Sequence, residues 1–120
     1  MELYFIRHAQ SVNNKLYEET GTWNGRDTDP ELTDLGHEQA RRPAEHVACA
    51  NGETLSRDYV NRGRFGFTHL YSSLMVRALA TSAHLAAALN LPLAVWEDLH
   101  ELGGIFVIDD FGRQRVRPHE

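Results

Sequence analysis

The hydrophobic positions of this chain predict short strands that alternate with helices. The sequence LYFI at residues 3–6 is a nearly continuous apolar run that stops at Arg7 and His8. Such a run suits a strand that is buried on both faces of a parallel sheet. We therefore expect a first strand over residues 3–6, with an arginine and a histidine at its carboxyl end.

A polar stretch over residues 9–32 separates this run from the next periodic segment. It contains turn-forming residues at Gly21, Gly25, Asp29 and Pro30. The stretch is too long for a plain connection, and long ordered loops are usually functional. We expect a functional loop here.

A helix is predicted to begin at Thr33 or Asp34, either of which can cap it, and to run to about Asn51. Its apolar residues recur on one face, at Ala40, Ala44, Val47 and Ala48. Pro43 removes one backbone hydrogen bond, so we expect the helix to kink or restart there.

The segment 52–67 is polar and predicts a variable surface loop. It interleaves arginines with aromatic residues, as single-strand-binding proteins do, at Arg57, Arg62, Arg64, Tyr59, Phe65 and Phe67. Glu53 and Asp58 reduce its net charge to about +1, which favours a solvated loop over a nucleic-acid site.

The second half of the chain continues the alternation. We expect a strand at residues 68–72, an alanine-rich helix capped by Ser73 and running through Ala88, a strand at 93–96 and a hairpin at 105–116. The order strand, helix, strand, helix, strand predicts two right-handed crossovers and a mostly parallel sheet covered by helices. The predicted fold class is α/β, with three layers in the order α/β/α, in one domain over residues 1–120.

Length and composition narrow the class of protein. The chain has 120 residues, 42% of them hydrophobic and 24% charged, which fits one small globular domain and argues against a disordered or membrane protein. The start of the chain lacks the features of a secretory signal, so we expect a cytoplasmic protein. Cys49 is the single cysteine, which excludes an internal disulfide and a multi-cysteine zinc site.

The charged residues add a second indication. A net charge of -5 makes nucleic acid an unsuitable partner, because nonspecific nucleic-acid binding depends on a basic surface. Of the twelve basic residues only Lys15 is lysine, so eleven are arginine. Genome composition accounts for such a bias in general, but a few arginines selected to grip phosphate or carboxylate would also contribute.

Chemically active residues follow each predicted strand. Arg7 and His8 follow the first, Arg77 lies in the helix after the second, and Glu101 follows the third. Ligands of parallel sheets bind at the carboxyl edge, where these residues meet. Arginines can hold phosphate oxygens, an imidazole can attack phosphorus, and a carboxylic acid can protonate the leaving oxygen. The pattern indicates phosphoryl chemistry.

Four stretches of the chain resemble, in order, the signatures of the histidine phosphatase superfamily, which includes the cofactor-dependent phosphoglycerate mutases. They are LYFIRHAQSVNN, DPELTDLGHEQA, YSSLMVRALATSA and LHELGG. The resemblance covers residues 3–104. It implies a phosphoglycerate mutase-like fold, of which this chain holds the N-terminal part and which is incomplete at the C-terminus.

The resemblance also implies roles for individual residues. His8 would be the nucleophile that forms a phosphohistidine, and Glu101 the proton donor. Phosphate would be held by Arg7, Arg77 and Asn14, and further substrate contacts would come from Ser11, Thr33 and Gly36.

Several of these residues have a plainer interpretation. Arg7 could form an ordinary salt bridge. Ser11 and Thr33 serve equally well as helix caps. Glu97 and Asp98 lie close enough in sequence to compete with Glu101 as the carboxylate.

The chain departs from the family pattern in two places. Ala9 stands where the family usually has glycine. The extra methyl group is costly only if the backbone there has a positive φ or must approach the phosphate closely. The family's second catalytic histidine, which follows a later apolar strand, has no counterpart, because His100 precedes Glu101 and His119 lies in a basic tail. We expect the other histidines at surface or core positions, and their spacing is not that of a metal site. They are His37, His46, His69 and His84.

The leading hypothesis is a phosphomonoester hydrolase that acts through a phosphohistidine on His8, without metal or cofactor, on a phosphorylated small molecule. One alternative is a phosphoglycerate mutase-type phosphotransferase. The other is a truncated phosphate-binding protein without full activity. An open sheet edge also predicts marginal stability or self-association, which a monodisperse, cooperatively unfolding monomer would contradict. The sequence leaves the natural substrate open.

Overall fold

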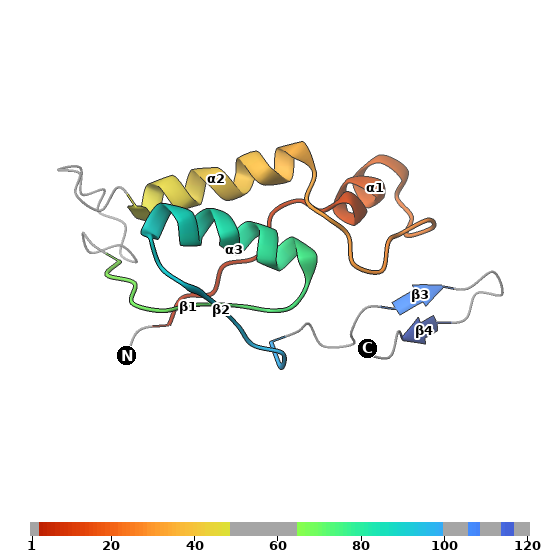
Figure 1. Ribbon diagram of the computed structural model, residues 1–120. Coiled ribbons are helices and arrows are strands. Elements are labelled where there is room, and N and C mark those ends of the chain that lie inside the picture. Colours follow the sequence, from red (N-terminus) through yellow and green to blue (C-terminus); the bar gives the residue numbers. More distant parts are fainter. Residues whose placement is uncertain (1–2, 49–64, 100–105, 109–113, 117–120) are drawn as a thin grey trace.

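A computed structural model describes residues 3–48, 65–99, 106–108 and 114–116 of the chain (Figure 1). The helices are α1 (Val12–Thr20), α2 (Asp34–Ala48) and α3 (Val76–Leu89). The strands are β1 (Leu70–Ser72), β2 (Leu93–Val95), β3 (Phe106–Ile108) and β4 (Gln114–Val116). Predictions for Cys49, residues 52–64, Glu101 and the two histidines His100 and His119 concern positions outside these ranges.

The sheet confirms the predicted parallel crossover. β1 and β2 pair in parallel, with Leu70 opposite Leu93 and Ser72 opposite Val95, and α3 connects them. Both strands are shorter than expected, since β1 begins at Leu70 and β2 ends at Val95. β3 and β4 pair antiparallel, as the predicted hairpin requires.

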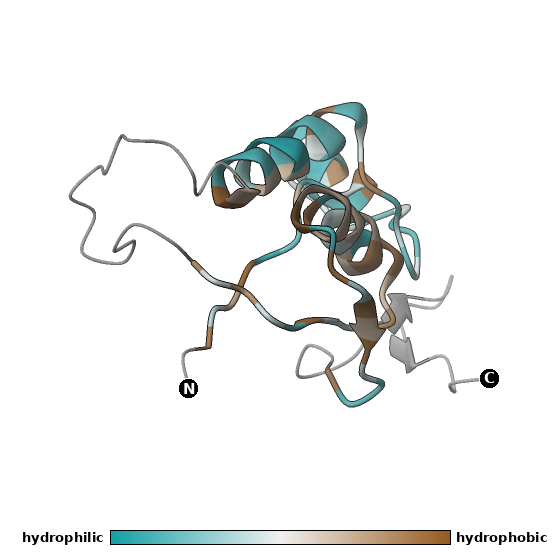
Figure 2. Cartoon of the chain, turned by 60° about the vertical axis from the view of Figure 1, so that its left-hand side comes forward, coloured by the Kyte–Doolittle hydropathy of each residue, from teal (hydrophilic) through white to brown (hydrophobic). Residues whose placement is uncertain are grey.

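The core lies between the two long helices and the sheet. α3 contacts both β1 and β2, and α2 packs on α3 (Figure 1). Ala44, Val47 and Leu85 are buried at the centre. Figure 2 shows hydrophilic residues on the side of the helices that faces away from the sheet. The described elements form a small α/β fold, and the third layer of the expected α/β/α arrangement stays a prediction.

The expected strand at residues 3–6 is wrong. These residues belong to no strand, and Leu3 and Phe5 expose 68% and 87% of their surface. Residues 4–8 and 70–73 instead line a mainly apolar hollow of about 420 Å³. We call it the apolar hollow. An apolar run is buried only where other segments cover both of its faces, and among the described residues none covers the side that carries Phe5.

The polar stretch at residues 9–32 contains a helix that the hydrophobic pattern did not indicate. α1 begins at a capping box, in which Asn14 N donates to Ser11 Oγ and Ser11 N donates to Asn14 Oδ1. It ends at Gly21, whose φ of 68° is the left-handed conformation that glycine adopts without strain. Gly25, at φ 82°, forms a further turn, as expected.

Helix α2 begins where the sequence indicates. Thr33 Oγ1 accepts a hydrogen bond from Gly36 N at 3.0 Å, so Thr33 is the cap and Asp34 the first helical residue. The helix does not restart at Pro43, because α2 continues through this exposed residue. Ala48 is exposed instead of buried, because the helix meets α3 on a narrower face than we expected.

Helix α3 begins two residues later than predicted. Its N-cap is Met75, which makes no side-chain cap, while Ser73 only accepts a hydrogen bond from Met75 N at 3.4 Å. The carboxylate of Asp29 takes over the capping role from a distant loop, since its Oδ1 accepts from Val76 N at 3.0 Å. The helix ends at Asn90, which has φ 52°, as the sequence indicates.

Within the described ranges, no helix is both long enough and apolar enough to cross a bilayer.

Candidate active site

The segment that follows the N-terminal apolar run forms one wall of a hollow of about 220 Å³. We call it the polar hollow, and its lining residues are Arg7, His8, Ala9, Gln10, Asn14, Glu18 and Gln39. Three of the predicted site residues, Arg7, His8 and Asn14, therefore meet at one place.

The imidazole of His8 is held in one tautomer. Its Nδ1 lies 2.7 Å from the carbonyl oxygen of Ala9. A carbonyl oxygen can only accept, so Nδ1 carries a proton, and in the neutral ring the lone pair is on Nε2. His8 is half-buried and borders both hollows. An imidazole in this state can act as a nucleophile through Nε2.

Asn14 takes part in the capping box of α1 and also lines the polar hollow. Its Oδ1 accepts hydrogen bonds from Ser11 N at 3.0 Å and Ser11 Oγ at 2.9 Å. Because a backbone N–H can only donate, the atom facing Ser11 is the oxygen, and the amide nitrogen of Asn14 keeps its hydrogens for the hollow. Ser11 itself is 2% exposed and acts as a cap, so it is a support for Asn14 and lines neither hollow.

Thr33 and Gly36 do not line the polar hollow but contact Gln10, which does. Thr33 Oγ1 donates to Gln10 Oε1 at 2.6 Å, and Thr33 N donates to Gln10 O at 3.1 Å. A Cβ on Gly36 would lie 2.1 Å from Gln10 O, so this position leaves no room for a side chain. Both residues thus fix the backbone beside His8, and neither lines the polar hollow.

The two predicted phosphate arginines occupy different environments. Arg7 is exposed and borders both hollows. Arg77 lies in the first turn of α3, is 8% exposed and lines neither hollow. It is linked to the His8 segment through Thr81, whose Oγ1 donates to Arg77 O at 2.8 Å and accepts from Ala9 N at 3.1 Å.

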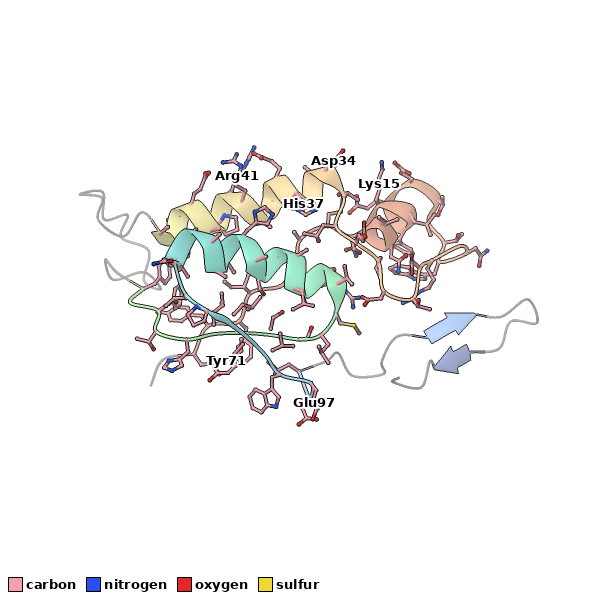
Figure 3. All side chains as sticks on the ribbon, viewed as in Figure 1. Lys15, Asp34, His37, Arg41, Tyr71 and Glu97 are labelled. Carbon is pink, nitrogen blue, oxygen red and sulfur yellow. The ribbon has the colours of Figure 1, made fainter. Side chains whose placement is uncertain are left out.

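The acidic residues near the end of β2 are separated by the fold. Asp98 borders the apolar hollow together with Arg7 and His8, whereas Glu97 does not. Figure 3 shows Glu97 at the lower end of the sheet, far from α1, which carries Asn14. Glu101 lies outside the described ranges.

Charged residues on the outer face of α2 form a separate group. Hydrogen bonds from Arg41 and then Arg42 lower the pKa of Glu38 below its ordinary value. Arg41 lies on the side of α2 away from the sheet (Figure 3), and none of these three residues lines the polar hollow. In the part of the chain that the structure describes, no three histidine, cysteine or acidic side chains gather as a metal site would require.

Sequence reasoning missed five residues that build or support the site. Gln39 Oε1 accepts from Gln10 N at 2.9 Å, and Gln10 Nε2 donates to Glu18 Oε2 at 2.7 Å. Thr81 and Asp29 fasten α3 to the preceding segments. The position of Thr81 four residues after Arg77 was a usable signal, because threonine in a helix often bonds the carbonyl one turn earlier.

Comparison with known proteins gives one match. The family model of the histidine phosphatase superfamily (branch 1) matches residues 3–105. Neither the curated proteins nor the solved structures give a significant match. The matched range contains all the residues of the polar hollow.

Proposed function

Since the chain belongs to the histidine phosphatase superfamily, whose members are generally phosphatases and mutases, we propose that it is a phosphomonoester hydrolase with His8 as nucleophile. The observation that carries the proposal is the hydrogen bond from His8 Nδ1 to Ala9 O, which assigns the lone pair to Nε2. Arg7 and the amide nitrogen of Asn14 supply a positive charge and hydrogen-bond donors beside it.

The first step transfers the phosphoryl group to the protein. Arg7 and Asn14 hold the phosphate oxygens while Nε2 of His8 attacks phosphorus. The bond from phosphorus to the ester oxygen breaks, and Glu101 donates a proton to the departing alkoxide. The hydrogen bond from Nδ1 to Ala9 O keeps the ring oriented throughout this step.

The second step releases phosphate. Water attacks the phosphohistidine, the bond between phosphorus and Nε2 breaks, and the carboxylate of Glu101 takes the proton of the water. His8 returns to its starting tautomer. Arg77 would add a second positive charge from the first turn of α3, although its side chain lines neither hollow in this structure.

Asp98 is a second candidate for the proton donor, because it borders the apolar hollow together with His8. The variants Glu101→Gln and Asp98→Asn separate the two. Loss of the acid should slow an alkyl phosphate, whose alkoxide needs the proton, far more than an aryl phosphate with a good leaving group. We expect this split in Glu101→Gln, and finding it only in Asp98→Asn would reassign the role.

Mutase-type transfer remains the alternative within the enzyme class, and it needs a site that excludes water while the phosphohistidine waits for its acceptor. The exposed position of Arg7 favours hydrolysis, because water can reach the polar hollow. Incubation with 3-phosphoglycerate and its bisphosphate distinguishes the reactions: inorganic phosphate supports a hydrolase, and 2-phosphoglycerate supports a mutase.

The basic test is hydrolysis of an aryl phosphate by the full chain in the presence of a chelator. We expect turnover that His8→Asn abolishes and His37→Asn retains, since His37 lies on α2 and lines neither hollow. Protection by phosphate in a thermal melt without turnover would instead favour a phosphate-binding protein that lacks full activity.

A further inference from the structure

Glu18 is an exposed residue that brings a negative charge to the polar hollow. It lies four residues after Asn14 on α1, so the two side chains share one face of the helix, one turn apart. Both line the hollow that also contains Arg7 and His8. A phosphate held by Arg7, His8 and Asn14 would therefore share this hollow with the carboxylate of Glu18.

A chain of hydrogen bonds keeps Glu18 in this place. Gln10 Nε2 donates to Glu18 Oε2 at 2.7 Å, and Gln10 is itself fixed because its Oε1 accepts from Thr33 Oγ1 at 2.6 Å. Gln10 N also donates to Gln39 Oε1 at 2.9 Å. The carboxylate of Glu18 is thus held at Oε2 by a side chain that is itself hydrogen-bonded to the neighbouring segments.

The charge of Glu18 has no counter-ion among the residues that the structure describes. Lys15, the single lysine of the chain, also lies on α1 but pairs with Glu19 at 3.8 Å. Within the same described ranges, Oε1 of Glu18 accepts no hydrogen bond. This oxygen can accept a hydroxyl or ammonium donor, whereas an anion beside it would be repelled.

We propose that Glu18 selects phosphate esters by the charge of the leaving alcohol. The site would favour alcohols that carry hydroxyl or ammonium donors and would discriminate against those that carry a carboxylate or a second phosphate. The inference rests on the proposed function, because it requires the phosphoryl group to lie at Arg7 and His8. It also argues against phosphoglycerate, whose carboxylate would face Glu18.

A matched pair of ligands tests this selection. Glycerol 3-phosphate and 3-phosphoglycerate both carry phosphate on a terminal carbon of a three-carbon chain, but the other end is a hydroxyl in the first and a carboxylate in the second. Their affinities for the full chain are measured by calorimetry in a His8→Asn background, which prevents turnover. Inorganic phosphate is the reference ligand for the phosphate site itself.

We expect glycerol 3-phosphate to bind about tenfold more tightly, since one like-charge contact in a partly hydrated site costs roughly that factor. Adding Glu18→Gln should bring the two affinities close together. Glu19→Gln makes the same change in net charge one residue further along α1, outside the polar hollow, and should keep the full discrimination.

Equal or tighter binding of 3-phosphoglycerate in the chain with Glu18 would overturn the inference, as would discrimination that survives Glu18→Gln. The proposed function fails separately, if no phosphohistidine forms on His8 in the unmodified chain. Discrimination without a phosphohistidine would leave Glu18 as the selector of a binding site. Absence of both ligand binding and a phosphohistidine in the unmodified chain would overturn both proposals.

Discussion

The hydroxyl oxygen of Thr81 accepts a hydrogen bond from the backbone N–H of Ala9 at 3.1 Å. This contact joins α3 to the residue directly after His8, across 72 positions of sequence. The same hydroxyl donates to Arg77 O at 2.8 Å, so both of its hydrogen-bonding roles are used. The backbone that carries His8 is therefore fastened to the helix that carries Arg77.

Replacing Thr81 with valine removes this link while preserving the shape of the side chain. The N–H of Ala9 would lose its partner in a partly buried position, which costs about 1–3 kcal/mol in the free energy of unfolding. Turnover of an aryl phosphate should also fall, because His8 is less firmly placed. Thr81→Ser keeps the hydroxyl and should retain most of both properties, and equal losses in the two variants would contradict the role of the hydroxyl.

Asn14→Asp separates phosphate binding from folding. The aspartate keeps an oxygen that accepts from Ser11 N and Ser11 Oγ, so the capping box of α1 should survive. It replaces the amide donor in the polar hollow with an acceptor and a negative charge. We expect the affinity for inorganic phosphate to fall about 100-fold with little change in the melting temperature.

Unchanged phosphate affinity in Asn14→Asp would show that this side chain serves only as a cap. Ser11→Ala is the matched control, because it weakens the cap and leaves the amide in place. It should lower stability by about 0.5–2 kcal/mol and affect phosphate affinity less than Asn14→Asp does.

The contact from Asp29 to Val76 N predicts that a loop residue supports the phosphate site through α3. Asp29→Ala leaves the first N–H of α3 without its partner, and we expect a loss of about 0.5–2 kcal/mol in stability. Asp29→Asn keeps an acceptor and should lose less. Because Arg77 lies in the same turn, phosphate affinity should also fall more in Asp29→Ala than in Asp29→Asn. Thermal melts with and without phosphate would measure both effects. A wild-type melting curve for Asp29→Ala would refute this role.

Gly36→Ala tests the close approach of α2 to the His8 segment. The added Cβ would lie 2.1 Å from Gln10 O, so the backbone beside the polar hollow must move. We expect a destabilisation of about 1–3 kcal/mol, together with weaker phosphate binding. Leu35→Ala, at a neighbouring residue that is 53% exposed, should change stability by no more than about 0.5 kcal/mol, and similar effects of the two variants would contradict the packing argument.

The sequence predicted well what depends on local chemistry. The parallel pairing of β1 and β2 was predicted from an alanine-rich helix between two short apolar strands, because each of these three parts has a recognisable pattern. Thr33 was, with Asp34, one of the two caps that the sequence offered, since the capping geometry needs only the next three residues. Arg7, His8 and Asn14, which the resemblance of residues 3–14 to a family signature placed together, line one hollow.

The errors concern features that depend on distant contacts. Residues 3–6 have the composition of a buried strand, but burial is decided by what packs on them. Helix α1 is short and polar and is held by Ser11, Asn14 and Gly21 at its ends, so it has little hydrophobic periodicity. The bonds of Thr81 and Asp29 join residues 72 and 47 positions apart, and no local pattern reveals such pairs.

The central claim is that His8 carries the phosphoryl group during turnover. The direct measurement mixes the full chain with a phosphate ester labelled in its phosphoryl group, stops the reaction in base within milliseconds, and follows the label bound to protein. We expect label that is stable in base and lost in acid, as a phosphohistidine requires, absent in His8→Gln and retained in His37→Gln. Label that persists in His8→Gln, or that is stable in acid, would contradict the account.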